Sequence, residues 1–444
     1  MTNRQKRWVG LIALLVAEAM NLLDATIVQV AAPVIHGELG GRAADIQWFS
    51  AAYTLPFAAL LITGGRLGDR FGRRRLFRLG VAGFVVTSTI CALAPEAAVL
   101  ISARAVQGAA AALVIPQTIG LIRSSFDGPD LPKALGSIGP VMGLAGISGP
   151  LLGGFITEVS SWRAVFLVNV PLGIGVLALA HLLPESRSPK LPGLDLIGTC
   201  LLIIGTALVV YPILQSRDWL LLPIGVAVLG LTVLQQAHSP AKLVELSLFR
   251  NHGFGAALIT STLFFAVMSG LTLVVVLHEQ LTLNHGVMRS SLMLLPWSAV
   301  SGIASWCAGR WLIPRFGSRL MYVGLGVLLV GVLGAHVWQL PMLGVCGVGV
   351  GLFTTAFFTE ALHRVQPQET GSAAGLLNAV QQFGGTLGVA GLGTIFLHHP
   401  ATPDRAFWVA TAVIAATVAT AHVMRSPRSR RLERAAPAPA RTAR

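Results

Sequence analysis

Two acidic residues fall inside an apolar run near the start of this sequence. Glu18 and Asp24 lie between Trp8 and Ile35, where most other residues are apolar. A run of this length can span a lipid bilayer, in which a charged side chain costs roughly 2.5–3.5 kcal/mol on insertion scales. Burial away from water favours the neutral form of a carboxyl group. Asp24 therefore has two interpretations: it binds and releases a proton, or it hydrogen-bonds a neighbouring helix.

The spacing of Glu18, Asn21 and Asp24 puts them on one side of a helix. Positions i, i+3 and i+6 cover an arc of about 120°, and we expect this arc to face a central cavity. Glu18 is then either a second carboxyl group in that cavity, where it could meet a cationic ligand, or a charge near the lipid headgroups.

A second polar pair lies in the apolar run 98–123. Arg104 and Gln107 are one helical turn apart on the same face. A guanidinium inside a bilayer needs a carboxylate or free carbonyl groups as acceptors. Arg104 therefore has three interpretations: it takes part in the function, it is a structural clamp, or its side chain reaches the outer headgroups. We expect Gln107 to line the central cavity.

The composition indicates how these residues are positioned. Of the 444 residues, 54% are hydrophobic and 11% are charged, too few charged residues for the surface of a soluble protein of this length. Apolar runs of about 20 residues recur, and we expect an all-α integral membrane protein with about fourteen spans. The net charge of +14 lies in short loops and the tail, so it indicates membrane orientation and not nucleic-acid binding. Neither a soluble domain, a phosphate-binding Gly-Lys-Ser/Thr loop nor a metal-ligand spacing is present, so an enzyme is not expected.

A short basic loop sets the orientation. Six of the twelve residues from Gly65 to Leu76 are charged, and cationic loops stay in the cytoplasm. With an even number of spans both termini lie on that side of the cell membrane, and the opposite loops hold only Arg42, Arg163, Arg217, Arg289 and Arg405.

The loop has an echo about 245 residues later, from Gly309 to Leu320. This second loop follows the second of the last six spans, just as the first loop follows the second of the first six. The match predicts two six-helix bundles with a site between them. The expected organisation is an N-terminal bundle at 1–183, a linker with two inserted spans at 184–252, a C-terminal bundle at 253–424 and a disordered basic tail at 425–444.

Small and polar residues mark two later spans. In the span 133–157 a glycine stripe allows close helix approach, and proline loosens the helix; it includes Gly146, Gly149, Pro150 and Gly153. In the span 371–397, Asn378 and Gln382 share a face that lines the cavity or packs on the N-terminal bundle.

Five motifs in order resemble the major facilitator superfamily, specifically its fourteen-helix drug:proton antiporter branch. They are Leu23-Asp24-x-Thr26-Ile27-Val28, Gly65-x-Leu67-x-Asp69-Arg70-x-Gly72-Arg73-Arg74, Arg104-x-x-Gln107-Gly108, Gly146-x-x-Gly149-Pro150-x-x-Gly153-Gly154 and Trp162-Arg163-x-x-Phe166-x-x-Asn169-x-Pro171.

The resemblance implies a multidrug efflux protein of bacterial type that exports hydrophobic or cationic drugs in exchange for protons, and hence antibiotic resistance. Asp24 and Arg104 would couple the proton. Conformational gating would involve Gly65, Asp69, Arg70, Gly72 and Arg73 in the loop, or else the loop is a solvated topology signal. The glycine motif is typical of antiporters.

The resemblance leaves other points as expectations. No cofactor besides the proton gradient is expected, and the partners are protons, small hydrophobic substrates and lipid, with a monomeric chain. Members often carry Arg where Gln381 stands; this departure, and the absence of a carboxylate within the span 371–397, leave fewer acidic groups for dications. A dedicated exporter of one metabolite such as a self-made antibiotic, an importer with the same fold, and a non-transporting membrane sensor remain alternatives.

Overall fold

The computed structural model describes residues 2–187, 193–239, 243, 247–250, 252–335, 339–363, 365, 369–400 and 404–425, and all the regular structure in these residues is helical. The predicted tail at 425–444 lies outside them except for Arg425, the last residue of the final helix.

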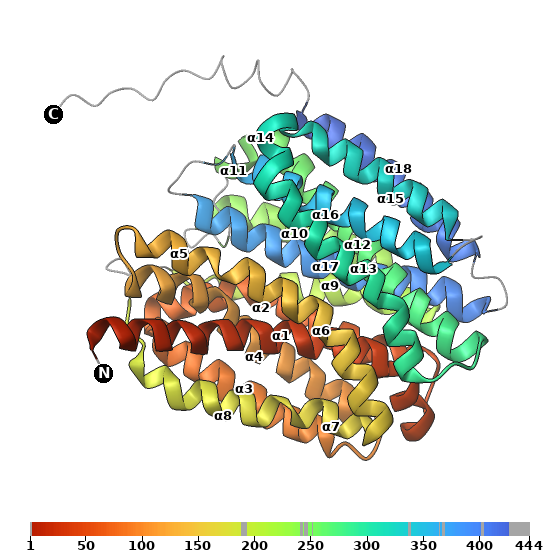
Figure 1. Ribbon diagram of the computed structural model, residues 1–444, viewed down its shortest axis with the longest axis horizontal. Coiled ribbons are helices and arrows are strands. Elements are labelled where there is room, and N and C mark those ends of the chain that lie inside the picture. Colours follow the sequence, from red (N-terminus) through yellow and green to blue (C-terminus); the bar gives the residue numbers. More distant parts are fainter. Residues whose placement is uncertain are drawn as a thin grey trace.

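The first half of the chain forms a group of helices that we call the N-terminal bundle (Figure 1, red to yellow). Within it α2 packs on α4, α3 on α4 and α1 on α6. Its elements are α1 (Asn3–Leu39), α2 (Ala44–Phe71), α3 (Arg73–Ala92), α4 (Ala97–Ser125), α5 (Asp130–Gly136), α6 (Ile138–Val159), α7 (Trp162–Leu167), α8 (Asn169–Leu179) and the 3₁₀ turn η1 (Ala180–Leu182).

The last part of the chain forms the C-terminal bundle (Figure 1, green to blue). Here α12 packs on α17 and α18, and α16 packs on α13 and α15. Its elements are α12 (His252–Leu277), the π-helical turn η2 (His278–Thr282), α13 (Val287–Cys307), the π-helical turn η3 (Ala308–Leu312), α14 (Ile313–Phe316), α15 (Arg319–Gly334), α16 (Gln339–His363), α17 (Thr370–His398) and α18 (Asp404–Arg425), preceded by the short α11 (Ser247–Arg250).

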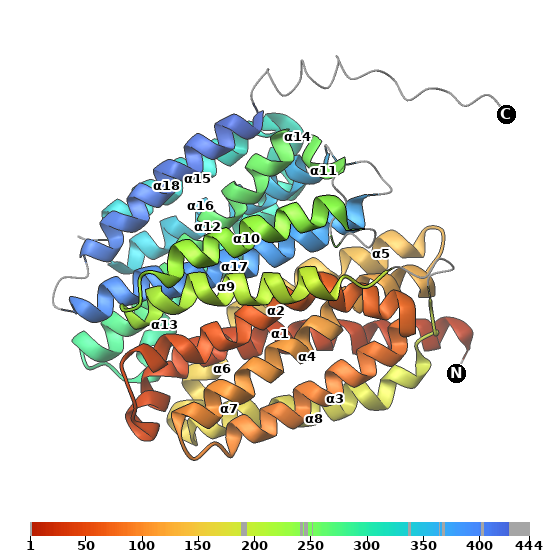
Figure 2. The ribbon, with the colours of Figure 1, turned by 180° about the vertical axis from the view of Figure 1, so that it is seen from behind.

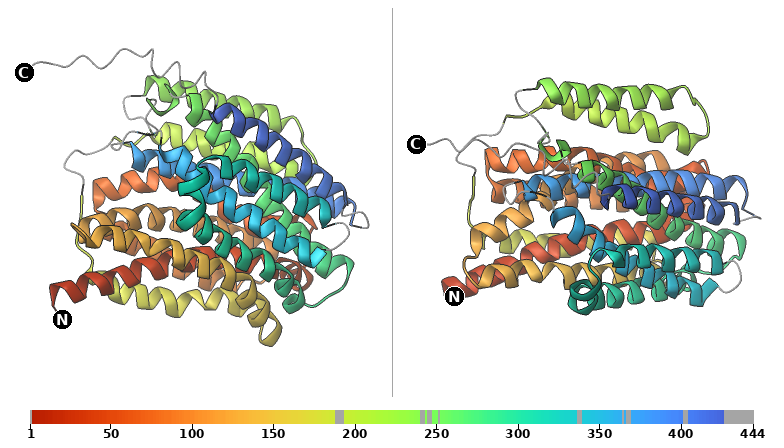
Figure 3. Two further views of the ribbon diagram at one scale, coloured as in Figure 1. Left: turned by 45° about the horizontal axis from the view of Figure 1, so that its top comes forward. Right: turned by 90° about the horizontal axis from the view of Figure 1, so that it is seen from above.

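A helical hairpin stands between the bundles in sequence and beside them in space. It consists of α9 (Leu196–Gln215) and α10 (Leu221–His238). Figure 2 shows it lying across the front of α2 and α17, and α9 contacts both of these helices. Seen from above, the hairpin lies outside the rest of the molecule (Figure 3, right). The inserted pair therefore packs on one helix from each bundle.

Twelve helices in the described residues are long and apolar enough to cross a membrane. This finding supports a multi-pass membrane protein but does not confirm a count of fourteen. Of the other two expected spans, α15 is apolar but has only 16 residues. The 29-residue α17 is long enough, but Gly, Thr, Asn and Gln residues dilute its hydropathy.

A glycine ends a helix in each of the two similar loops, Gly65 to Leu76 and Gly309 to Leu320. Gly72 closes α2 with φ 106°, and Gly317 closes α14 with φ 55°. Positive φ is accessible to glycine because it has no Cβ atom. The two echoed loops thus share a backbone feature as well as a sequence pattern.

The two bundles are joined by side-chain hydrogen bonds toward the end of the molecule away from the start of α1 and the end of α18. Gln29 Nε2 donates to Ser269 O (2.9 Å), Gln280 Nε2 to Val30 O (3.0 Å) and Gln47 Nε2 to Val389 O (2.8 Å). At the same end, the backbone N–H of Met288 donates to Glu158 Oε2 (2.9 Å), and the Thr54 and Thr386 hydroxyls are 2.6 Å apart. We call this the closed end.

Candidate functional site

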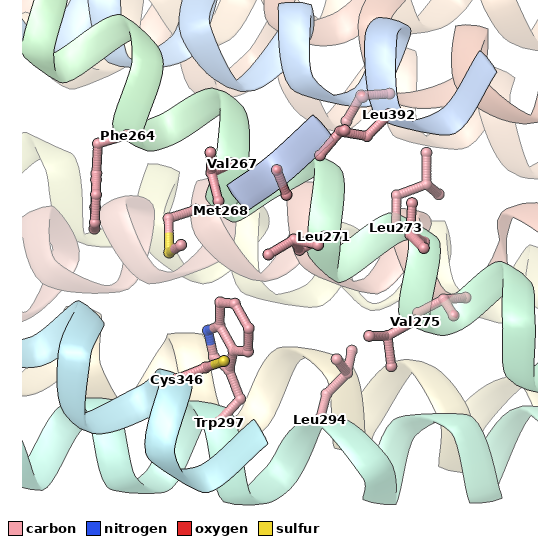
Figure 4. Close-up of a cluster of buried hydrophobic side chains, with 14 of the residues drawn as sticks. Phe264, Val267, Met268, Leu271, Leu273, Val275, Leu294, Trp297, Cys346 and Leu392 are labelled. Atoms are coloured by element: carbon pink, nitrogen blue, oxygen red, sulfur yellow. The ribbon is translucent and has the colours of Figure 1, made fainter. Parts of the chain in front are cut away.

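A cavity of about 310 Å³ lies at the seam between the bundles. Helices from both bundles form its wall, and Asn21, Tyr53 and Gln382 are among the lining residues. Figure 4 shows buried apolar side chains of the C-terminal bundle, where Trp297 extends from α13 toward Met268 of α12; both also line the cavity. A concave space lined by apolar side chains and a few convergent polar groups is the expected form of a small-molecule site.

Asp24 and Arg104 meet in an ion pair inside the N-terminal bundle. Both residues are 1% exposed, and Arg104 Nη1 donates to Asp24 Oδ2. The guanidinium also donates from Nε to Phe49 O at 3.0 Å, and its carbon lies 4.2 Å from the centroid of the Tyr53 ring. The sequence predicted that a buried guanidinium would need an acceptor, and the structure supplies both a carboxylate and a carbonyl oxygen.

Two amide side chains complete the shell of this carboxylate. Gln107 Nε2 donates to Asp24 Oδ1 at 3.1 Å, and Asn169 Nδ2 donates to the same oxygen at 2.8 Å. Both amides also donate to the Ser88 hydroxyl, at 2.7 and 3.1 Å. Gln107 accepts in turn from Arg104 Nη1 at 2.7 Å. One carboxylate therefore connects α1, α4 and α8, and through Ser88 it reaches α3.

The arc on α1 does not face the cavity as a whole. Asn21 lines the cavity, whereas Glu18 and Asp24 are not among its lining residues. An arc of about 120° is wide enough for its two edges to meet different neighbours. Asp24 turns to Arg104, and Glu18 lies beside Thr118 of α4 with 7% of its surface exposed. Among the described residues Glu18 forms no ion pair.

Tyr53 connects the buried pair to the cavity. Its ring faces the Arg104 guanidinium, and its hydroxyl accepts from Asn21 Nδ2 at 2.6 Å. Asn21 and Tyr53 both line the cavity. A change in the position of Arg104 would therefore reach the cavity wall through a single side chain.

Two other expected cavity residues lie elsewhere. Gln107 is fully buried in the Asp24 shell, and Asn378 is not among the lining residues, whereas Gln382 and its neighbour Gln381 are. Asn378 lies one turn before Gln382, nearer the start of α17, which places it beyond this cavity.

The glycine stripe of α6 packs mainly inside its own bundle. Gly149 has no room for a Cβ atom beside the Thr26 hydroxyl, and a Cβ atom at Gly153 would lie 3.1 Å from Ile27 Cα. Gly146 has space, and it lines the cavity together with Pro150. The seam contact comes from Gly154, which lies against Ser291 of α13.

Three of the loop residues expected to take part in conformational gating contact their neighbours. Asp69 pairs with Arg73 one turn on, and the guanidinium of Arg73 occupies the space beside Gly120 of α4, while Gly65 packs against Pro116. Arg70 is exposed and forms no ion pair within the described residues.

Arg74 contacts residues 109 and 111 positions further along the chain. Its Nη1 donates to Leu183 O at 3.0 Å, and its Nε lies 3.7 Å from Glu185 Oε2. The loop thus holds the segment that follows η1.

Sequence reasoning gave no separate role to Asn169, Ser88 or Tyr53. For Asn169 and Ser88 the available signal was a polar residue inside an apolar run, because in a bilayer such a group is retained where it finds a partner.

Comparison with known proteins finds relatives that are similar over most of this chain. A protein of Streptomyces coelicolor named as a probable actinorhodin transporter is 39% identical over 88% of this chain and 72% of its own length. The drug efflux pump JefA of Mycobacterium tuberculosis is 35% identical over 89% of this chain and 81% of its own length. The puromycin resistance protein pur8 of Streptomyces alboniger is 33% identical over 88% and 82%.

The fold is also that of a solved transporter. A bacterial homologue of the human lysosomal transporter Spinster, in an inward-facing and unoccupied conformation, superimposes with a TM-score of 0.70 and 17% identity, covering 98% of this chain and 99% of that one. The sequence itself matches the family description over residues 14–389. The resemblance drawn from the five motifs is thereby confirmed, and the chain belongs to the Major Facilitator Superfamily.

Proposed function

We propose that this protein exports small hydrophobic drugs from the cytoplasm in exchange for protons. The observation that carries the proposal is a cavity at the seam of two bundles with a buried Asp24–Arg104 pair directly behind its wall. The relatives named as a drug efflux pump and a puromycin resistance protein support export as the direction.

The proposed membrane arrangement has fourteen spans and two cytoplasmic termini. In it α17 crosses the membrane between α2 and α12, a protein-lined position that tolerates Gly and Gln. The basic loop at Arg73 and Arg74 then lies in the cytoplasm. The closed end faces outward, and this conformation is the one that receives a substrate from inside.

The proposed coupling begins at Asp24. All three of its side-chain partners, Arg104, Gln107 and Asn169, are hydrogen-bond donors to the carboxylate. A proton that reaches Asp24 removes the charge that holds Arg104. Arg104 then moves relative to Tyr53, which changes the cavity wall and shifts the balance between the two conformations.

Purified protein in vesicles with a pH gradient tests this function. We expect drug uptake into inverted vesicles to be accompanied by proton release, and both to stop when an ionophore collapses the gradient. Uphill drug movement that persists without a proton gradient would refute proton coupling. A control without drug measures the passive leak.

A dedicated exporter of one antibiotic is the second candidate. It is favoured by the 39% identity to a probable actinorhodin transporter. A susceptibility panel in a pump-deficient host separates the two: protection against many unrelated compounds supports multidrug export, and protection against one compound supports the dedicated exporter.

A further inference from the structure

The wall of the seam cavity contains no carboxyl, imidazole, ammonium or guanidinium group. Every one of its lining residues lies in the described part of the chain, and none is Asp, Glu, His, Lys or Arg. Its polar groups are amides, such as Gln29, Gln381 and Gln382, and hydroxyls, such as Thr26 and Ser269. An amide offers both donors and acceptors, and a hydroxyl offers both as well.

The charges nearest the cavity do not compensate a charged ligand. Asp24 is paired with Arg104 and is shielded by two amides, so the pair carries no net charge. Glu18 lies one turn from Asn21 but outside the cavity wall, beside Thr118. A ligand ion in the cavity would therefore be desolvated without an opposite charge, which costs several kcal/mol even after relaxation.

Aromatic rings give the cavity its shape preference. Tyr53, Phe57, Phe265 and Trp297 line it, with Met268 beside Trp297. Such rings favour flat apolar molecules. They could also attract a cation, but the Tyr53 ring is already engaged by the Arg104 guanidinium that lies over it.

We infer that this cavity selects uncharged, flat aromatic molecules that carry hydrogen-bonding groups at their edges, and that it discriminates against both cations and anions. The inference rests on the proposed export function, which it narrows: the structure assigns the neutral members of the drug class to this site and excludes the cationic ones.

Three probes with one ring system test the inference directly. They are anthracene derivatives with a hydroxymethyl, a trimethylammonium-methyl or a sulfonate group, and binding to the purified protein is measured by equilibrium dialysis. We expect the hydroxymethyl compound to bind at least about tenfold more tightly than either ion, which corresponds to about 1.4 kcal/mol. Equal or tighter binding of the trimethylammonium compound overturns the inference, and so does a failure of all three to bind.

Two charge variants at one position provide a gain of function. With Gln381→Glu we expect the trimethylammonium compound to bind at least about tenfold more tightly than it binds the unchanged protein, and with Gln381→Arg the sulfonate compound should gain similarly. Gln5→Glu adds the same charge at the exposed start of α1 and should change none of the three affinities. Unchanged ion affinities in folded Gln381 variants would overturn the inference.

Vesicle transport separates this inference from the proposed function. If the hydroxymethyl compound binds preferentially but is not moved against its gradient, export fails and the selectivity stands. If all three compounds are exported equally well, export stands and the selectivity fails. If a Gln381 variant does not elute as a single folded species, the comparison of the three probes on the unchanged protein still decides the question.

Discussion

The two charges of the Asp24–Arg104 pair can be removed one at a time and together. These variants show whether the pair is a structural clamp or couples proton movement to drug export. Asp24→Asn leaves the Arg104 guanidinium buried, with the Phe49 carbonyl and the Gln107 amide as its remaining oxygen acceptors. Breaking a buried ion pair from one side costs about 3–5 kcal/mol, because the remaining charge is uncompensated. Arg104→Gln strands the carboxylate in the same way, although Gln107 and Asn169 still donate to it.

The double variant Asp24→Asn/Arg104→Gln removes both charges and leaves amides that can hydrogen-bond each other. We therefore expect it to be more stable than either single variant, with a coupling of at least about 2 kcal/mol between the two sites. The measurement is thermal unfolding in one detergent, with size-exclusion chromatography of a fluorescent fusion protein as the readout. The order of the midpoints is the quantity compared, since unfolding of a protein with several bundles is not two-state.

Transport by the double variant then decides the role of the pair. We expect it to exchange drug downhill but to lose uphill, proton-driven export. Asp45→Asn is the matched control, because Asp45 is also a buried acid but accepts from the Arg42 backbone N–H at 2.9 Å and not from Arg104; it should keep uphill export. A stable double variant that exports uphill at the unchanged rate would refute the coupling argument and make the pair a clamp.

The remaining predictions concern packing and closure. Gly149→Val should destabilise the protein by about 1–3 kcal/mol because the Thr26 hydroxyl leaves no space for a side chain, whereas Gly146→Ala should be tolerated; thermal unfolding compares the two, and equal stabilities would contradict the packing argument. Gln280→Ala removes hydrogen bonds to Val30 O and Ser290 Oγ, so the closed end should be destabilised by about 1–2 kcal/mol. A cysteine introduced at this end should then be labelled faster, and an unchanged labelling rate would contradict a role of these hydrogen bonds in closure. Gly72→Ala should cost about 1–2 kcal/mol because its φ of 106° is unfavourable for a residue with a Cβ atom, and unfolding midpoints equal to those of the unchanged protein would refute this.

The helices were predictable from hydropathy because in a bilayer each backbone polar group must be satisfied within its own segment. The prediction of 98–123 corresponds to α4 at Ala97–Ser125, and that of 371–397 to α17 at Thr370–His398. The apolar run between Trp8 and Ile35 lies within α1, which runs from Asn3 to Leu39. Its polar ends continue the helix outside the apolar run, where hydropathy carries no signal.

The site was only partly predictable for a geometric reason. The sequence identified Asp24 and Arg104 because each is costly in a bilayer, but it could not tell which neighbour Asp24 faces, since that depends on where α4 and α8 pack. The role of Asn169 depends on a contact across 145 positions. The link from Arg74 to Glu185 spans 111 positions, and the sequence alone shows two charges without their relation.

The α9–α10 hairpin makes the two flanks of the molecule unequal. On one flank α2 meets α17, and α9 covers this junction by packing on both helices. On the other flank α6 meets α13 away from this hairpin, and α6 exposes Leu144 and Phe155. A molecule dissolved in the lipid therefore meets a different surface at each junction. At the α2–α17 junction it meets an extra layer of protein, whereas the α6–α13 junction borders the acyl chains directly.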